Sequence, residues 1–285
     1  MMRLSKIVLS VVGLTVLVSI GMSPAEAALI GAGSNNMNAP IYSIDTTTGV
    51  QTLLGNSGLP NVQALAFSPT GVLYGTAGTS GNQSLITINQ TTGAATVVAP
   101  INGPDGVSFI TGLGFSPSGT VYAVGRNFDQ VGSLYTLDIT TGTEARIGTT
   151  NAVQIQDMAF SPSGAAFAVN NGSAGVPGSL TTRGVRSLDL ATGNTTFLGP
   201  AGGSTVNLTS MTFTPDGTLW IGGGGNLYTA DTTTGALSQQ YTGLATFSAL
   251  AAVAPVPVPA AIWLFGSGLA AMVGFARRKS SSNSY

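Results

Sequence analysis

Two short motifs recur along this chain, and their spacing restricts the possible folds more than any other feature. The first is Phe-Ser-Pro-x-Gly or its variant Phe-Thr-Pro-Asp-Gly, with copies that begin at Phe67, Phe115, Phe160 and Phe213. The second is (Asp/Asn)-x-x-Thr-Gly, with copies that end at Gly49, Gly93, Gly142, Gly193 and Gly235. Successive copies lie about 42 to 53 residues apart, which is the length of one four-stranded propeller blade. The body of the chain therefore reads as a series of blades.

Each repeat reads as four short strands. In the second repeat we expect strands at 62–67, 72–78, 84–89 and 94–99, with 62–67 innermost. Apolar and β-branched residues dominate these segments, which suits strands that are packed on both faces. Pro and Gly in one motif, and Thr-Thr-Gly in the other, supply the turns. The same unit recurs from residues 110, 155 and 208.

The first and last repeats are incomplete in complementary ways. Three strands are expected at 28–33, 41–45 and 50–55, without an innermost strand, whereas 247–253 is a lone strand. If the lone strand pairs with 28–33, the ring closes and no sheet edge stays open. The sequence thus predicts an all-β, five-bladed propeller with four-stranded blades over residues 28–254. Residues 172–184 are expected to form a loop.

The composition excludes several kinds of chemistry. The chain has no Cys and no His, and only 7% of its residues are charged. Zinc sites built on thiolate or imidazole, Ser-His-Asp and Cys-His relays, and disulfides are therefore excluded. The chain also lacks the basic patch that a nucleic-acid partner would require. We expect no cofactor and no nucleic acid.

The N-terminus has the pattern of a secretory signal peptide. Arg3 and Lys6 precede an apolar run from Ile7 to Ile20, and Ala25 and Ala27 fit the small-x-small cleavage pattern. Residues 1–27 are thus expected to be a signal helix that is removed after Ala27. The alternative is an uncleaved membrane anchor.

The C-terminus, residues 255–285, has a different pattern. A Pro-x-Pro segment is followed by an uncharged stretch at 260–276 and then by a basic tail at 277–285. As a helix, 260–276 would rise about 25 Å, just enough to cross a bilayer. Basic residues remain on the cytoplasmic side, so the propeller is expected outside. The residues of the basic stop are Arg277, Arg278 and Lys279.

This order of features resembles the PEP-CTERM sorting signal of Gram-negative bacteria, in the variant that reads V-P-L-P-A. The matching residues are Val256, Pro257, Val258, Pro259, Ala260 and Ala261, with Val258 in place of Leu. The resemblance implies recognition by an exosortase, a membrane cysteine transpeptidase, and cleavage near the motif. An inner-membrane precursor would then be released or attached at the cell surface. The alternative is a permanent C-terminal anchor.

Few residues within the body are candidates for a ligand site. Asp157 is the only charged residue within an innermost strand, so it could bind a cation or a sugar hydroxyl in the central channel, or merely face water there. Asp105, Arg126, Asp129 and Arg183 lie in expected loops. The motif residues Asp45, Asn89, Asp138, Asp189 and Asp231 could bind calcium but are dispersed, so turn capping is favoured. Gly222–Gly225 lacks a following helix and reads as a strand end and a turn.

Two classes of function remain open. The favoured one is a non-enzymatic protein of the cell surface or extracellular matrix, which would bind exopolysaccharide or another surface protein. Its other partners would be the secretion machinery and the exosortase. The alternative is a propeller enzyme of the lyase or lactonase type with a metal at the channel mouth. The scarcity of carboxylates and the lack of His disfavour that alternative.

Overall fold

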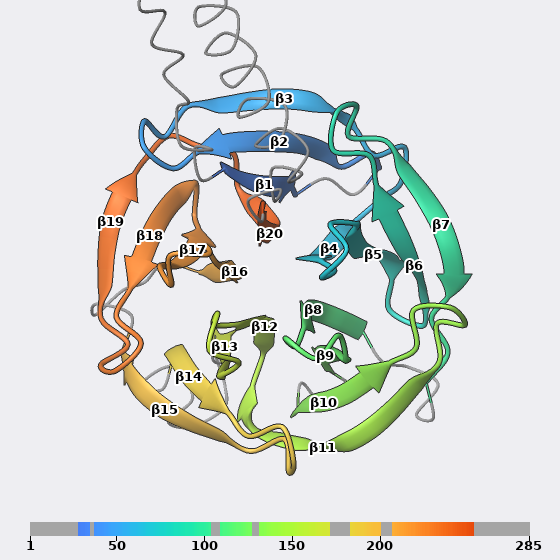
Figure 1. Cartoon of the computed structure of the whole chain (residues 1–285), viewed down its shortest axis with the longest axis vertical. Coiled ribbons are helices and arrows are strands. Elements are labelled where there is room, and N and C mark those ends of the chain that lie inside the picture. Colours follow the sequence, from blue (N-terminus) through green and yellow to red (C-terminus); the bar gives the residue numbers. More distant parts are fainter. Residues whose placement is uncertain are drawn as a thin grey trace, which may run out of the picture.

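A computed structural model describes residues 28–34, 37–103, 109–126, 131–171, 183–200 and 207–253. They form twenty strands in five four-stranded antiparallel sheets, which are arranged as a ring (Figure 1). The prediction of an all-β, five-bladed propeller is confirmed. The expected signal helix and C-terminal membrane helix lie outside the described residues.

The blades are numbered from the one that contains the N-terminal strands. Blade 1 consists of β20 (Phe247–Ala252), β1 (Ala28–Gly33), β2 (Pro40–Asp45) and β3 (Gln51–Asn56). Blade 2 consists of β4 (Val62–Phe67), β5 (Leu73–Thr79), β6 (Asn82–Ile88) and β7 (Ala95–Pro100). Blade 3 consists of β8 (Phe109–Phe115), β9 (Val121–Arg126), β10 (Val131–Leu137) and β11 (Glu144–Val153). Blade 4 consists of β12 (Ile155–Phe160), β13 (Ala166–Asn170), β14 (Gly184–Leu188) and β15 (Thr195–Pro200). Blade 5 consists of β16 (Leu208–Phe213), β17 (Leu219–Gly223), β18 (Asn226–Ala230) and β19 (Leu237–Tyr241).

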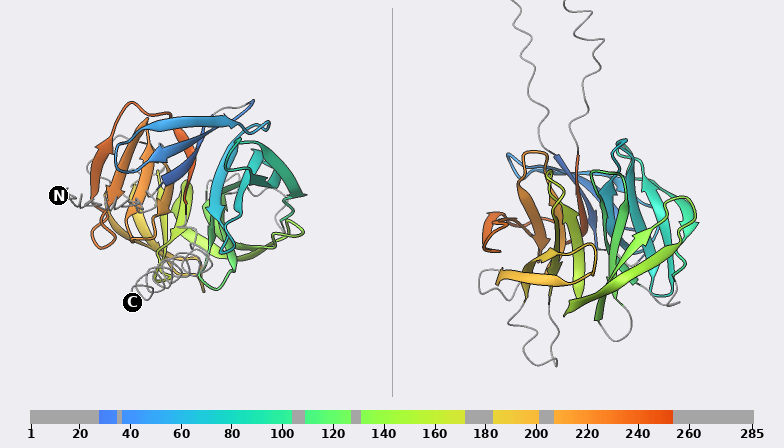
Figure 2. Two further views of the ribbon diagram at one scale, coloured as in Figure 1. Left: turned by 45° about the horizontal axis from the view of Figure 1, so that its top comes forward. Right: turned by 60° about the horizontal axis from the view of Figure 1, so that its bottom comes forward.

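The ring closes through the first and last strands of the described chain. β20 pairs antiparallel with β1, and the amide of Val253 donates to the carbonyl of Ala28 over 2.9 Å. Each innermost strand also contacts its two neighbours around the ring. The predicted closure is therefore confirmed, and Ala28 and Val253 lie side by side on one face of the propeller (Figure 2).

That face also carries both kinds of repeated turn, and we name it the turn face. In blades 2 to 5 the Ser/Thr-Pro-x-Gly turns join the innermost strand to the second strand, and in all five blades the (Asp/Asn)-x-x-Thr-Gly turns join the third strand to the outermost one. In the first kind, the Gly71 amide donates to the Ser68 carbonyl over 2.9 Å. The opposite face carries the other connections, and we name it the loop face.

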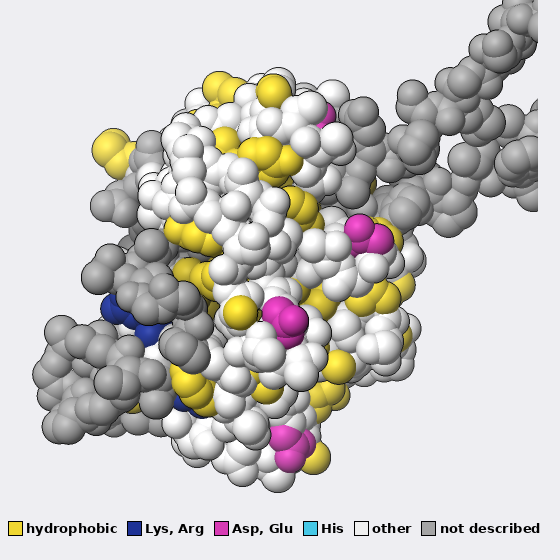
Figure 3. Space-filling model, turned by 90° about the vertical axis from the view of Figure 1, so that its left-hand side faces the viewer, with side chains coloured by type: hydrophobic (Ala, Val, Ile, Leu, Met, Phe, Trp, Pro, Cys, Tyr) yellow, Lys and Arg dark blue, Asp and Glu magenta, His cyan; other side chains and the backbone are white. Residues whose placement is uncertain are grey.

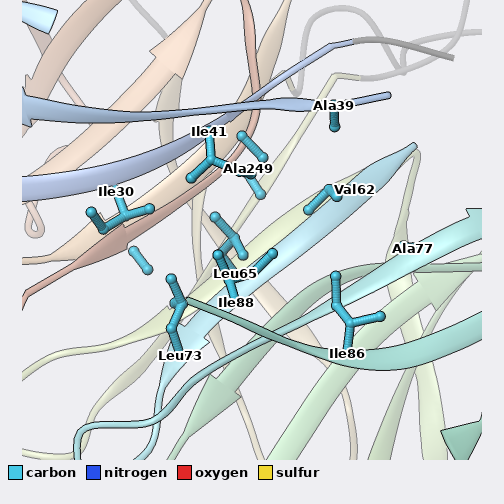
Figure 4. Packing of buried hydrophobic residues seen from close by; sticks show 12 residues of the cluster. Ile30, Ala39, Ile41, Val62, Leu65, Leu73, Ala77, Ile86, Ile88 and Ala249 are labelled. Atoms are coloured by element: carbon cyan, nitrogen blue, oxygen red, sulfur yellow. The ribbon is translucent and has the colours of Figure 1, made fainter. Parts of the chain in front are cut away.

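Apolar residues fill the seams between blades. Between blades 1 and 2, Ile30, Ile41, Val62 and Ile86 belong to one buried cluster (Figure 4). Burial from both sides explains why these strands are apolar on both faces.

Aromatic pairs follow the seams near the turn face. Each pair joins the second strand of one blade to the innermost strand of the next: Tyr74–Phe115, Tyr122–Phe160 and Phe167–Phe213. At the seam between blades 5 and 1 the innermost strand has Ala252 instead, and the larger Trp220 occupies the second-strand position. This seam therefore combines one large and one small residue, Trp220 and Ala252, where three other seams combine two aromatic rings.

The Thr-Gly turns dock each blade against the previous one at the rim. A Cβ at Gly142 would overlap the carbonyl oxygen of Pro100 in blade 2, and one at Gly193 would lie 3.2 Å from the backbone of Gly148 in blade 3. Gly142 also has φ +72°. The repeated glycine of this motif therefore serves both the local turn and the contact between blades.

We expect Gly142→Ala to destabilise the protein much more than Gly119→Ala. Both glycines have positive φ, so each alanine would cost about 1–2 kcal/mol of backbone strain. A Cβ at Gly119 would meet nothing within 4 Å, whereas Gly142 would add a clash that costs a further 1–3 kcal/mol or so. Urea unfolding of the two variants measures the difference. Equal losses would show that rim docking does not restrict this turn.

Candidate functional site

The innermost strands surround the channel, and side-chain hydrogen bonds join them to one another. In three seams a hydroxyl donates to the first carbonyl of the next innermost strand: Ser248 to Val62, Thr111 to Ile155, and Thr209 to Phe247. In the seam between blades 2 and 3, Gln83 instead bonds both the amide and the carbonyl of Ile110. These bonds join neighbouring blades near the channel, and the polar groups that form them are therefore not free to contact a ligand.

Asp157 has the same kind of role. Its side chain is 0% exposed, and its carboxylate accepts the Met158 amide at 2.8 Å and the Met211 amide at 2.7 Å. The second bond joins β12 to β16 across the seam between blades 4 and 5. A Cβ at Gly112 would lie 2.6 Å from Asp157 Oδ1, so a glycine in β8 provides the space for this side chain. The expectation that Asp157 faces water in the channel is wrong, because neighbouring innermost strands enclose it completely.

Burial sets the protonation of this carboxyl. Loss of hydration raises the pKa of Asp157 well above its ordinary value, and the two amide donors oppose that rise only in part. A buried, hydrogen-bonded acid of this kind is suited to holding two strands together. It has no exposed surface with which to bind a cation or a sugar.

The mouth of the channel on the turn face forms a hollow. It encloses about 340 Å³ and is lined by the Phe-Ser/Thr-Pro motifs of four blades together with Ala251 and Ala252. None of its lining residues is charged. The mouth thus offers apolar and hydroxyl groups but no general acid, general base or metal ligand of the carboxylate type.

The motif acids cap their own turns, as predicted. Asp45 Oδ1 accepts the amides of Thr47 and Thr48, and Asp138 Oδ1 accepts those of Thr140 and Thr141. The equivalent bonds occur at Asn89, Asp189 and Asp231. Backbone hydrogen bonds, above all from Thr47 and Thr140, lower the pKa of Asp45 and Asp138.

These acids do not converge on one point. In the described part of the chain, no group of three or more His, Cys, Asp or Glu residues could hold a metal ion. On the side of the ring drawn in Figure 3, the acidic side chains are separate spots rather than one patch. The dispersal follows from the repeat, which places one capping residue on each blade, an Asp in four blades and Asn89 in blade 2.

The other sequence candidates are spread as well. The Arg126 guanidinium lies 5.7 Å from the centre of the Phe109 ring, and Arg183 donates to the Asn171 carbonyl over 2.6 Å. Asp105 and Asp129 lie outside the described residues. Gly222–Gly225 forms the end of β17 and a tight turn, as predicted, with φ +59° at Gly224 and +76° at Gly225. The expected loop at 172–184 lies mostly outside the described residues, and Gly184 begins β14.

The two processing signals also lie outside the described residues. They include the cleavage residues Ala25 and Ala27, the motif 256–261 and the basic stop 277–279. Within the described residues, no helix is long and apolar enough to span a membrane.

Two buried charged residues escaped the sequence analysis, Glu144 in β11 and Arg186 in β14. Arg186 lies within β14 and is only 5% exposed. The only available signal was its position in the repeat, since the third strands of the other four blades have Tyr or Ile there. Detecting that difference requires the strand registers, which the structure supplies.

Comparison with known families gives one match for the body of the chain and a separate one for the C-terminus. Residues 61–262 match a family described as a repeat of unknown function, DUF6923. The chain belongs to this family. In this DUF6923 protein the match begins just before β4 and continues past β20, so it covers most of the propeller. Residues 255–279 match the PEP-CTERM protein-sorting motif, which confirms the predicted resemblance and implies an exported protein sorted through the membrane by an exosortase-related system.

Several solved structures resemble this DUF6923 protein at low sequence identity. A chain of the nidogen/laminin complex is 12% identical, with a TM-score of 0.52, and the match covers 81% of this chain and 99% of that one. Regucalcin from Agrobacterium tumefaciens, a calcium-binding protein, is 15% identical with a TM-score of 0.47 and coverages of 82% and 80%. TolB from Acinetobacter baumannii is 16% identical with a TM-score of 0.48, and the match covers 76% of this chain but only 53% of TolB. No curated protein matches the sequence.

Proposed function

We propose that this protein is a non-enzymatic binding or structural component of the cell surface or extracellular matrix. An exosortase would sort it through its C-terminal signal and cleave it near that signal. The observation that carries the proposal is the PEP-CTERM match at 255–279, which begins three residues after β20 ends. A folded domain and a sorting signal are thus joined almost directly.

The short connection between the propeller and the sorting motif supports cleavage of an already folded domain. Val256 follows the last described residue, Val253, by three residues, which span at most about 10 Å when extended. The motif must therefore stay close to the turn face while the propeller is folded. Cleavage there would release a domain whose ring is already closed by β1 and β20.

The chemistry of the described residues supports a binding role over an enzymatic one. The sequence has no His or Cys, the acid within the inner ring is buried, and the mouth on the turn face has no charged lining residue. A rigid ring with many surface hydroxyl groups and backbone groups suits recognition of a polymer. The expected partners are exopolysaccharide or another surface protein, together with the sorting enzyme.

Mass spectrometry of the C-terminal peptide, on protein recovered from the native cell surface, tests the proposal. We expect a C-terminus near Pro259 or Ala260, and an intact C-terminus in the double variant Pro257→Ala/Pro259→Ala. The matched control Pro255→Ala, outside the V-P-V-P motif, should be processed normally. An intact Arg277-Arg278-Lys279 tail in the membrane fraction of the wild type would instead indicate a permanent anchor and overturn the sorting proposal.

A further inference from the structure

Arg186 breaks the repeat at a buried position. In each blade the pairing of the third strand with the outermost strand has a register shift. The third-strand residue directly after this shift is Tyr42, Ile86, Tyr135, Arg186 or Tyr228 in blades 1 to 5. Four blades thus have an aromatic or aliphatic side chain where blade 4 has a cation. A buried cation costs stability unless a partner compensates it, so a local exception of this kind points to a function.

The protein's own groups compensate Arg186 only in part. Its Nε donates to Asn170 Oδ1 and its Nη1 to Thr195 Oγ1, both over 3.1 Å, and its guanidinium lies 5.4 Å from the centre of the Phe197 ring. Among the described residues no carboxylate pairs with it, and its Nη2 has no hydrogen-bond partner. Burial lowers the pKa of Arg186.

The surrounding polar groups have a surplus of donors. Asn151 Oδ1, from the neighbouring blade 3, accepts both the amide and the hydroxyl of Thr195, at 2.9 and 2.6 Å. An amide N–H can only donate, so this bond fixes the orientation of the Asn151 side chain, and no described residue accepts a hydrogen bond from its Nδ2. The free groups of the cluster are therefore N–H donors beside a positive charge. A ligand that satisfies them must be an acceptor and an anion.

The hydrogen-bonded cluster of Arg186, Asn170, Thr195 and Asn151 reaches solvent at the rim of the propeller. Asn151 is exposed and Phe197 is half-buried, and they lie on the adjacent outermost strands β11 and β15. A flat aromatic ring next to a charged donor suits a sugar ring that carries an acidic group.

We propose that Arg186 and Asn151, with Phe197 beside them, bind the carboxylate of an acidic saccharide at the rim between blades 3 and 4. The carboxylate bonds Arg186 Nη2 and Asn151 Nδ2, and the sugar ring lies against Phe197. The choice of a saccharide rests on the proposed surface function, whereas the choice of an anion rests on the donor surplus alone.

Calorimetry and thermal unfolding of the full-length protein in detergent test the site with galacturonate, polygalacturonate and neutral galactose. We expect galacturonate and its polymer to bind and to raise the Tm, and galactose to have no effect. The variant Arg186→Tyr installs the residue of blades 1, 3 and 5. It should bind galacturonate at least tenfold more weakly while its own Tm is unchanged or higher, since a packed apolar side chain replaces an uncompensated charge.

Arg126→Gln is the matched control, because Arg126 is also an arginine over an aromatic ring but has no equivalent amide cluster. It should bind galacturonate as the wild type does. Equal binding by wild type and Arg186→Tyr would overturn the site, and equal stabilisation by inorganic sulfate would overturn the saccharide assignment. Neither result depends on C-terminal processing, so failure here is distinguishable from failure of the sorting proposal.

Discussion

Asp157→Ala is expected to lower the free energy of unfolding by about 2–6 kcal/mol. The substitution leaves the buried amides of Met158 and Met211 without an acceptor, and each unsatisfied donor costs about 1–3 kcal/mol. The smaller volume of alanine is not the reason for the expected loss, because blades 1 and 2 have Ala249 and Ala64 at the same position of the innermost strand. Urea unfolding followed by circular dichroism measures the loss. A loss below 1 kcal/mol would show that the bond between β12 and β16 contributes little.

The same substitution should change the pH dependence of stability. Because burial raises the pKa of Asp157 in the folded state, the folded protein binds this proton more tightly than the unfolded chain does. The contribution of Asp157 is thus complete below the unfolded pKa of about 3.9 and declines as the pH rises towards the folded pKa. The difference in stability between wild type and Asp157→Ala should therefore shrink above about pH 4. Taking the difference cancels the opposite effect of the exposed turn acids. A difference that grows with pH would contradict this assignment.

Trp220→Ala is expected to cost about 3–5 kcal/mol, the usual range for removing a large buried aromatic residue. Trp220 is 7% exposed and stacks on Tyr241 with ring centres 6.4 Å apart and planes 8° from parallel. Tyr241 in turn donates its hydroxyl to the Thr46 carbonyl of blade 1 over 2.8 Å. The substitution thus weakens the seam between blades 5 and 1. For a domain of this size, the Tm should fall by roughly 2–4 °C per kcal/mol.

A double substitution tests why this seam differs from the others. The second strands of blades 2 and 3 place Tyr opposite a Phe of the next innermost strand. In the seam between blades 5 and 1 the equivalent positions hold Trp220 and Ala252, which belong to one apolar cluster. We expect Trp220→Tyr and Ala252→Phe each to destabilise the protein, the first by leaving a cavity and the second by crowding. Combined, they should recover much of the loss, because the pair then copies the other seams. Strictly additive losses would show that the two positions do not share one space.

The repeat also determined which parts of the candidate sites could be predicted. The turn-capping role of Asp45 and Asp138 followed from local chemistry, because an Asp side chain reaches amides only two and three residues away. Asp157 was identified as unusual but its environment was misjudged. Whether an innermost-strand residue faces the channel or the adjacent strand depends on how closely the strands approach, and that depends on Gly112 in another blade.

By itself, the sequence determined the number of blades, their four-strand pattern, the closure by the first and last strands, and the sorting motif. All of these depend on neighbours along the chain or on a repeat that copies itself. Only the tertiary structure decided that Asp157 is sealed between β12 and β16, that the Thr-Gly turns dock adjacent blades, and that Arg186 and Asn151 both bond Thr195. Arg186 and Asn151 belong to different blades and are 35 positions apart, so their link through Thr195 depends on the packing of one blade against the next. No local pattern contains that information.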